Sequence, residues 1–225
     1  MKNIVYLVFA FLLIITTSCG NNSIKNFNDE PSSETEGIQM KYEIEIDHPI
    51  PENGPGIIKV YKQSVPAMRF IGYNNGSGQH PDWGTAWGLD VFGKIEQASG
   101  GEEASHLLYE DADAYIGMYY RNEETGGYDG WVGMFASPGT EVPEGLSYID
   151  FPEQNFGVCW LYGIGDWPGA YELKPQVPDV LKAAGMVIKS DEKGYIGHFE
   201  RDLCPRFTTP DEKGNIIIDY IYFVE

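Results

Sequence analysis

One seven-residue pattern occurs twice in the chain, and it constrains the fold more than any other feature. The later copy reads Tyr195-Ile-Gly-His-Phe-Glu-Arg201, and the earlier copy, 80 positions before it, reads Tyr115-Ile-Gly-Met-Tyr-Tyr-Arg121. Both are rich in β-branched and aromatic residues, as strands are. A repeated strand of this kind predicts a domain that is built from two copies of one unit.

Other matches follow the same order at offsets of 80 to 86 residues. Pro66 and Phe70 correspond to Pro152 and Phe156, and the Asp-Trp pair at Asp82 corresponds to the pair at Asp166. Proline, tryptophan and glycine are common at turns, so each match could arise by coincidence. Four matches in one order favour duplication.

Each copy is predicted to contain one helical segment among strands. In the first copy, Trp83, Trp87, Val91 and Ile95 are four residues apart, which is typical of one helix packed on a sheet. In the second copy, Pro175 and Pro178 interrupt a helical segment that runs towards Ala184, which predicts two short helices or one late-starting helix. The predicted strands are residues 57–61, 65–73, 115–121, 130–136, 146–151, 195–201 and 216–224.

These elements predict an α+β fold. Duplicated β-α-β-β units, residues 57–137 and 146–225, would form one domain with an antiparallel-rich sheet and a helix from each half. A hydrophobic content of 42% in 225 residues is enough for one such core.

The first residues have the features of an export signal. Lys2 supplies a positive charge, and the apolar run that ends at Ile15 is too short for a comfortable membrane span. Thr16-Thr-Ser-Cys19 resembles a bacterial lipobox, although Thr16 stands where leucine is usual. We therefore expect a lipoprotein signal peptide at 1–18 and a lipid on Cys19, which would anchor the protein in the cell envelope, periplasmic or at the cell surface. An ordinary secretory signal with an incidental cysteine is the alternative.

Residues 19–55 are predicted to be a flexible tether, because they are rich in Asn, Ser, Glu and Pro and poor in large apolar side chains. A weak alternation over 41–46 could form an early strand. The folded domain is expected to span 56–225.

Charge and cysteine usage narrow the partners. A net charge of −19 argues against nucleic acid, which requires clustered Lys and Arg, and favours cationic ligands. Cys159 and Cys204 could form a disulfide in an exported protein, or Cys159 could be a buried thiol. No Cys or His spacing predicts a metal site, and no cofactor is expected. The isolated histidines, which leave haem binding as a weak possibility, are His48, His80, His106 and His198.

Glu200 is the carboxylate of the repeated strand. Strand alternation places His198 and Glu200, with Ile196, on one face and Tyr195, Gly197, Phe199 and Arg201 on the other. Glu200 could be a solvated carboxylate on an edge strand, or it could lie in a pocket.

Several C-terminal residues carry a family resemblance. Phe199-Glu200 on the penultimate strand, then Cys204-Pro-Arg-Phe207, then the last strand from Asp219 to Val224, in a duplicated domain, resemble the gyrase-inhibitor-like (GyrI-like) family over 57–225. These are the effector-binding domains of AraC-type and MerR-type regulators. The resemblance implies an aromatic pocket between the two halves, in which a buried glutamate, here Glu200, pairs with cationic lipophilic molecules.

Two departures from the family pattern affect this expectation. Asp202 stands where the family often has tyrosine, and no helix-turn-helix is expected before the domain. Tyr120, at the repeat-equivalent position of Glu200, could donate a hydrogen bond into the same pocket. The other rings expected nearby, for each of which core packing is the alternative, are Tyr119, Trp131, Trp160, Tyr162, Phe199 and Tyr222.

The leading functional hypothesis is a lipid-anchored protein that binds small, cationic or amphipathic molecules. One alternative is a hydrolase-like enzyme that acts on reactive small molecules with Glu200 as general base and Tyr120 beside it. Another is a protein-interaction module at the cell surface. The sequence contains no nucleophile elbow, metal set or phosphate loop that would favour the enzyme.

Overall fold

The computed structural model describes residues 41–100, 114–166 and 168–225. The chain divides into residues 1–34, which lie outside the described ranges, and residues 35–225, to which the structural statements below refer. The signal peptide, Cys19, most of the tether and His106 therefore stay predictions. Within the described ranges, no helix has the length and apolar character that crossing a bilayer requires.

The domain is α+β, and its main element is a nine-stranded sheet in which every pairing is antiparallel. The strand order is β1-β2-β7-β11-β10-β4-β5-β3-β6. The strands are β1 (Lys41–Asp47), β2 (Gly56–Val65), β3 (Met68–Ser77), β4 (Ala114–Arg121), β5 (Tyr128–Ala136), β6 (Ser147–Phe151), β7 (Gln154–Ile164), β10 (Gly197–Leu203) and β11 (Asn215–Val224). A separate short hairpin joins β8 (Ser190–Asp191) to β9 (Gly194–Tyr195).

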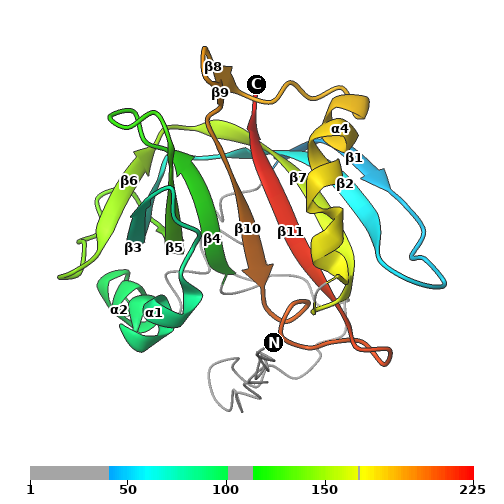
Figure 1. Cartoon of the computed structure of the whole chain (residues 1–225), viewed down its shortest axis with the longest axis horizontal. Coiled ribbons are helices and arrows are strands. Elements are labelled where there is room, and N and C mark those ends of the chain that lie inside the picture. Colours follow the sequence, from blue (N-terminus) through cyan, green and yellow to red (C-terminus); the bar gives the residue numbers. More distant parts are fainter. Residues whose placement is uncertain (1–40, 101–113, 167) are drawn as a thin grey trace, which may run out of the picture. The chain divides into compact units, whose positions relative to one another are not determined.

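The two faces of the sheet bury different sets of side chains. The inner face holds a cluster of phenylalanines from most strands, and the sheet curves around it. This curvature brings Phe151 of the edge strand β6 into a stack with Phe223 of β11, with 5.5 Å between ring centroids. The opposite face, here called the helix face, carries the helical segments (Figure 1).

Two helical segments cover separate parts of the helix face. Helices α1 (Trp83–Gly88) and α2 (Val91–Ala98) pack Ala86, Val91 and Ile95 against β3 and β5. The 3₁₀ helix η2 (Ala170–Gln176) and helix α4 (Val177–Ala183) pack against β7 and β11. Figure 1 shows α1 and α2 on the left and α4 on the right, with β4, β10 and β11 visible between them.

The single helix expected from the four-residue spacing is in fact two short helices. Asp90 has a left-handed backbone, with φ of 54°, which ends the regular helix before α2 begins. As a result Trp87 is 51% exposed, whereas Val91 and Ile95 are buried. In the second half the interruption by Pro175 and Pro178 is confirmed, because η2 gives way to α4 at Val177.

Each half has the order strand-strand-helix-strand-strand, one strand more than the predicted β-α-β-β unit. The first half runs from β2 to β5 and the second from β6 to β11, leaving out the hairpin. Strands β2, β3, β4 and β5 of the first half correspond to β6, β7, β10 and β11 of the second. When β1 is left out and each strand is replaced by its counterpart, the strand order is the same order read from the other end of the sheet. Duplication itself remains a prediction.

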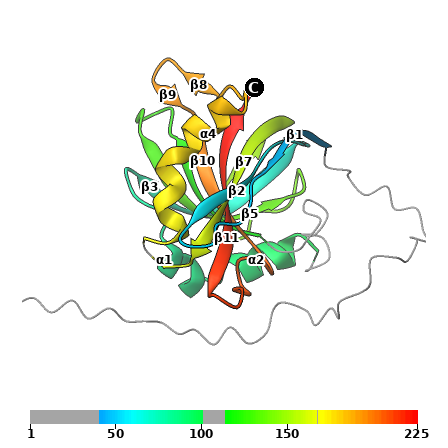
Figure 2. The same cartoon turned by 90° about the vertical axis from the view of Figure 1, so that its right-hand side faces the viewer.

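The early strand is confirmed, and the tether prediction is wrong for its last part. β1 pairs with β2, with Ile46 opposite Val60, and the two strands lie side by side in both views (Figures 1 and 2). Ile44 packs against the cluster beneath η2 and α4. Weak alternation therefore sufficed here, because the strand needs only one partner at the edge of the sheet.

The possible disulfide between Cys159 and Cys204 is absent, and both cysteines are buried. Cys159 lies in β7, and Cys204 follows β10, with β11 between these strands. Two strand spacings exceed the Cα separation that a disulfide can bridge, which is at most about 7 Å. Burial raises the pKa of the Cys159 thiol to about 12.

Candidate functional site

A cavity opens on the helix face above the two central strands, between the two helical segments. Its volume is about 100 Å³. β4, β10 and β11 form its floor, η2 and α1 contribute one residue each to its walls, and the loop before α1 lies beside it. The lining residues are His80, Pro81, Trp83, Gly117, Tyr119, Lys174, His198, Glu200 and Tyr220.

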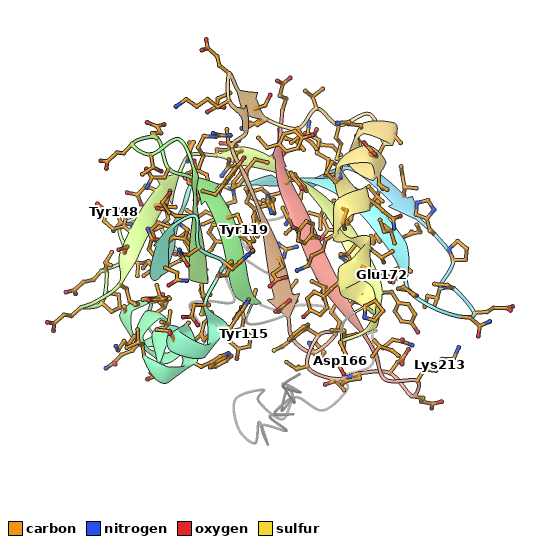
Figure 3. The ribbon with its side chains drawn as sticks, viewed as in Figure 1. Tyr115, Tyr119, Tyr148, Asp166, Glu172 and Lys213 are labelled. Carbon is orange, nitrogen blue, oxygen red and sulfur yellow. The ribbon has the colours of Figure 1, made fainter. Side chains whose placement is uncertain are left out.

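The strand register explains which side chains reach this cavity. Glu200 lies opposite Gly117 of β4 and opposite Tyr220 of β11, and His198 lies opposite Tyr119. Residues directly opposite each other on antiparallel strands share a face, so all five positions are on the helix face. Figure 3 shows Tyr119 on the side of β4 that carries the helices.

Gly117 makes room for two of the lining groups. A Cβ atom at this position would lie 2.7 Å from Cζ2 of Trp83 and 3.1 Å from Oε1 of Glu200. Because the first distance is shorter than a real Cβ contact, any larger residue would displace the tryptophan ring. Glycine therefore allows the indole and the carboxylate to approach the same point of β4.

Glu200 does not lie on an edge strand, and it is not free. β10 is paired on both sides, and the Glu200 side chain is only 13% exposed. Oε2 forms an ion pair with Nζ of Lys174, which extends from η2. The Lys174 ammonium also lies 4.5 Å from the ring centroid of Tyr171 and 5.2 Å from that of Tyr220. One carboxylate and two rings thus surround one cation.

His198 is held among aromatic rings. Its ring is nearly parallel to those of Tyr119 and Tyr222, at centroid distances of 5.0 Å and 5.2 Å. Burial, and secondarily the charge of Lys174, lower the pKa of His198 to about 4. The imidazole is therefore neutral at pH 7 and adds no charge to the cavity.

The tyrosines of the cavity keep their protons. Burial, followed by the charge of Glu200, raises the pKa of Tyr119, whose hydroxyl is 2.6 Å from Nδ1 of His80. Burial is also the main cause that raises the pKa of Tyr220, with Tyr222 and Glu200 adding to it. Each hydroxyl is therefore a hydrogen-bond donor at neutral pH.

Asp202 lies two residues beyond Glu200 on the same face, and it is 5% exposed. Its Oδ1 has no hydrogen-bond partner among the described residues. Burial, followed by the charge of Glu200, raises the pKa of Asp202 well above its usual range. Asp202 thus adds a carboxyl group that is protonated more readily than usual.

The sequence-predicted rings divide between the two faces. Tyr119 lines the cavity with Glu200, and Tyr222 lies beside it, stacked on His198. The remaining predicted residues are on the inner face or at its margin, away from Glu200: Tyr120, Trp131, Trp160, Tyr162 and Phe199.

The expectation that Tyr120 points into the cavity of Glu200 is wrong. Tyr120 lies opposite Gly197, whose face is that of Phe199, and its ring packs against Phe151 and Phe223 at 5.3 Å and 5.8 Å. An offset of 80 aligns Tyr120 with Glu200 in sequence, but a register that is wrong by one residue exchanges the faces of a strand.

The other inner-face residues have structural surroundings. Trp131 packs on Phe70, and Phe199 is fully buried among phenylalanines. The Trp160 ring lies 4.6 Å from the guanidinium of Arg206, which pairs with the buried Asp219. The hydroxyl of Tyr162 donates to Asp211 at 2.5 Å. For Trp131 and Phe199, core packing was the correct alternative.

Sequence reasoning missed Lys174, Trp83, His80 and Tyr220 as cavity residues. Tyr220 could have been found, since it alternates with Tyr222 along one strand. Lys174 carries no such signal, because the packing of η2 determines where its side chain points. In the described ranges, no group of three or more His, Cys, Asp or Glu side chains is arranged to hold a metal ion.

No family model matches the chain, and no curated protein matches it. Solved structures do resemble it at low sequence identity. A protein from Staphylococcus aureus MU50, described as a bacterial transcription regulation protein, has 14% identity and a TM-score of 0.48, and the match covers 76% of this chain and 99% of that one.

Two further structures are similar to a comparable extent. SAV2435 bound to tetraphenylphosphonium has 12% identity and a TM-score of 0.43, with coverage of 74% of this chain and 93% of that one. A hydrolase from Listeria innocua has 14% identity and a TM-score of 0.41, with coverage of 78% and 94%. Such identities and scores assign neither a family nor a function to this chain.

Proposed function

We propose that this domain binds small organic cations, including amphipathic ones, in the cavity on the helix face. The observation that carries the proposal is the Glu200 carboxylate, which is 13% exposed and lies among rings. A buried carboxylate is costly unless a positive charge compensates it. The site therefore favours a positive charge at Glu200, which the Lys174 ammonium supplies within the chain.

The rings around Glu200 support the same ligand class. Trp83, Tyr119 and Tyr220 line the cavity. Tyr171 lies against the ammonium group of Lys174, which also lines it. Each ring face that a cation touches contributes on the order of 0.5–2 kcal/mol. His198 is neutral at pH 7 and does not oppose a cation.

The size of the cavity restricts the ligand. A volume of about 100 Å³ is below the roughly 300–1,000 Å³ of sites for drug-sized molecules. A compact quaternary ammonium group, such as that of choline, is therefore a better probe than a large dye. A larger amphipathic molecule would place only its cationic head at Glu200.

The test is a calorimetric titration with choline and with its neutral carbon analogue, dimethylbutanol. We expect the wild-type protein to bind choline with a Kd of about 1 mM or tighter, which corresponds to at least about 4 kcal/mol. Glu200→Gln retains the shape of the side chain and removes its charge, so choline affinity should fall at least tenfold, about 1.4 kcal/mol.

Dimethylbutanol controls for hydrophobic uptake, and its affinity should be the same for both proteins. Thermal unfolding of Glu200→Gln establishes that the variant is folded. Choline binding that is equal in the wild type and in Glu200→Gln would refute the proposed role of Glu200.

We further propose that the protein is exported and anchored through a lipid on Cys19, on the basis of the apolar run and the lipobox-like residues before it. Mass spectrometry of the mature protein is expected to show an acylated Cys19 at the N-terminus, and Cys19→Ala to yield a form released from membranes. An N-terminus elsewhere, or an unmodified cysteine, would contradict this proposal.

We also propose that the two halves arose by duplication and that the domain is GyrI-like. Both statements are supported by the matching element order of the halves and by the strand order, which is the same from either end of the sheet when corresponding strands are exchanged. The hydrolase alternative required Tyr120 beside the general base Glu200. Tyr120 instead lies on the opposite face of the sheet from Glu200. No contact of the described residues favours an interaction module.

A further inference from the structure

The Glu200 site already contains a cation that belongs to the chain. Lys174 reaches from η2 to the carboxylate and places its ammonium over Tyr171 and Tyr220. The Glu200 carboxylate and the faces of Tyr171 and Tyr220 are also among the contacts that the proposed function offers to a bound organic cation. The lysine thus satisfies the same groups that a ligand would need.

The position of Lys174 has consequences for charge and for space. Its ammonium compensates the charge of Glu200, so a second cation beside both groups would meet repulsion as well as attraction. Its side chain is 26% exposed, which leaves one side of it in contact with solvent. Lys174 can therefore leave the carboxylate without first crossing the protein interior.

We infer that Lys174 is an internal competitor at Glu200, and that it sets the affinity of the site for organic cations. A ligand cation binds by displacing the Lys174 ammonium from the carboxylate and the rings. A strongly hydrated primary amine is readily given up to water, whereas a quaternary ammonium favours ring faces. The site should therefore prefer quaternary or alkylated cations to simple amines.

This inference rests on the proposed function and makes a separate claim. The proposed function requires binding that depends on Glu200. The inference requires, in addition, that Lys174 opposes this binding. Removal of the lysine must then increase affinity, which no purely structural role of the ion pair would produce.

The test compares choline binding by the wild type, Lys174→Met and Lys182→Met. Methionine retains most of the unbranched side chain and removes the ammonium. Lys182 is the matched control, because it lies in the adjacent α4, its side chain is 53% exposed, and it does not line the cavity. We expect Lys174→Met to bind choline at least tenfold more tightly than the wild type and Lys182→Met to bind within twofold of it.

Two further variants assign the effect to the carboxylate. The double variant Lys174→Met with Glu200→Gln should lose the gained affinity, and Lys174→Arg, which keeps a cation in place and favours ring faces more than lysine does, should bind choline no more tightly than the wild type. Because every ligand cation must displace the same lysine, choline should outcompete methylamine to the same extent in the wild type and in Lys174→Met.

The outcomes separate the two claims. Equal affinity of the wild type and Lys174→Met, with binding that Glu200→Gln abolishes, overturns the inference and leaves the proposed function intact. The absence of Glu200-dependent binding from both proteins overturns the proposed function and the inference with it.

A second measurement covers the case in which Lys174→Met does not fold. In the wild-type protein with isotopically labelled lysine side chains, choline should shift the ε-methylene signal of Lys174 and leave that of Lys182 unchanged. The signals can be assigned with Lys174→Arg, which keeps a cation at this position, and Lys182→Met. Choline binding without any shift of the Lys174 signal would overturn displacement.

Discussion

At the scale of single side chains, His198 links the cavity to pH. Its pKa of about 4 in the folded protein is below the value of about 6.5 expected in the unfolded chain. Between these values the unfolded chain binds more protons than the folded one. The folded state therefore loses stability as the pH falls from about 6.5 towards 4. Above pH 7, where His198 is neutral in both states, this loss of stability is absent.

Replacement of His198 should remove this pH dependence. His198→Phe retains a ring between Tyr119 and Tyr222 but cannot take up a proton. Between pH 7 and pH 4.5 the wild type should lose about 2–3 kcal/mol more unfolding free energy than the variant. Urea titrations at the two pH values measure this, with His48→Phe, at an exposed position, as the control for losing a histidine.

An identical decrease in stability for the wild type and His198→Phe would show that His198 is protonated without cost. The affinity of the cavity for choline provides a second readout at the same pH values. A positive charge on His198 would lie close to Lys174 and would repel a ligand cation as well.

The direction of a side chain could be predicted from the sequence where local periodicity determines it, and not where tertiary packing does. Strand alternation correctly placed His198 and Glu200 together, because this periodicity is local. It failed for Tyr120, whose face follows from its pairing with Gly197 and not from its alignment with Glu200. Lys174 could not be predicted at all, since tertiary packing places η2 on β7 and β11, from where its lysine reaches Glu200 of β10.

At the scale of elements, the sequence was most informative where residues that interrupt helices, such as proline, act locally. Pro175 and Pro178 correctly predicted a divided helix, because proline lacks the backbone donor that a continuous helix needs. The break between α1 and α2 follows Gly88, the last residue of α1, but a lone glycine did not predict it, and Asp90 adopts a left-handed backbone there. A regular spacing of apolar residues therefore overestimated the length of this helix.

β1 provides a prediction at this scale. A chain that begins at residue 41 should be as stable as one that begins at residue 20, whereas a chain that begins at residue 56 should lose about 2 kcal/mol, or about 4–8 °C in Tm. Without β1, the backbone of β2 becomes an open edge, Ile44 no longer covers the cluster beneath η2, and the ion pair of Lys62 with Glu43 at 3.2 Å disappears.

Thermal unfolding of the three chains measures this difference. Ser64→Ala in the longest chain is a useful control, because it removes a hydrogen bond at β2 that involves Asn155 of β7 and leaves β1 in place. Equal melting temperatures for the chains that begin at residues 41 and 56 would show that β1 contributes nothing to the sheet.

At the scale of the whole domain, the fold class followed from the sequence, but the strand order did not. The mixture of period-two runs with two helical stretches predicted an α+β domain with an antiparallel-rich sheet. The pairing of β4 with β10 joins residues from 77 positions apart (Tyr120 and Gly197) to 89 apart (Ala114 and Leu203). No local pattern encodes such a pairing, and the cavity depends on it.

The symmetric strand order of the two halves has a consequence for how the site could have originated. In the sheet, the first strand of each half pairs with the second strand of the other half, and β4 meets β10 at the centre. On the proposed duplication, the ancestor would have been a homodimer with exchanged strands, and the cavity its symmetric interface. Fusion into one chain would then have freed the two walls to diverge, with Gly117 on one and Glu200 with its lysine on the other.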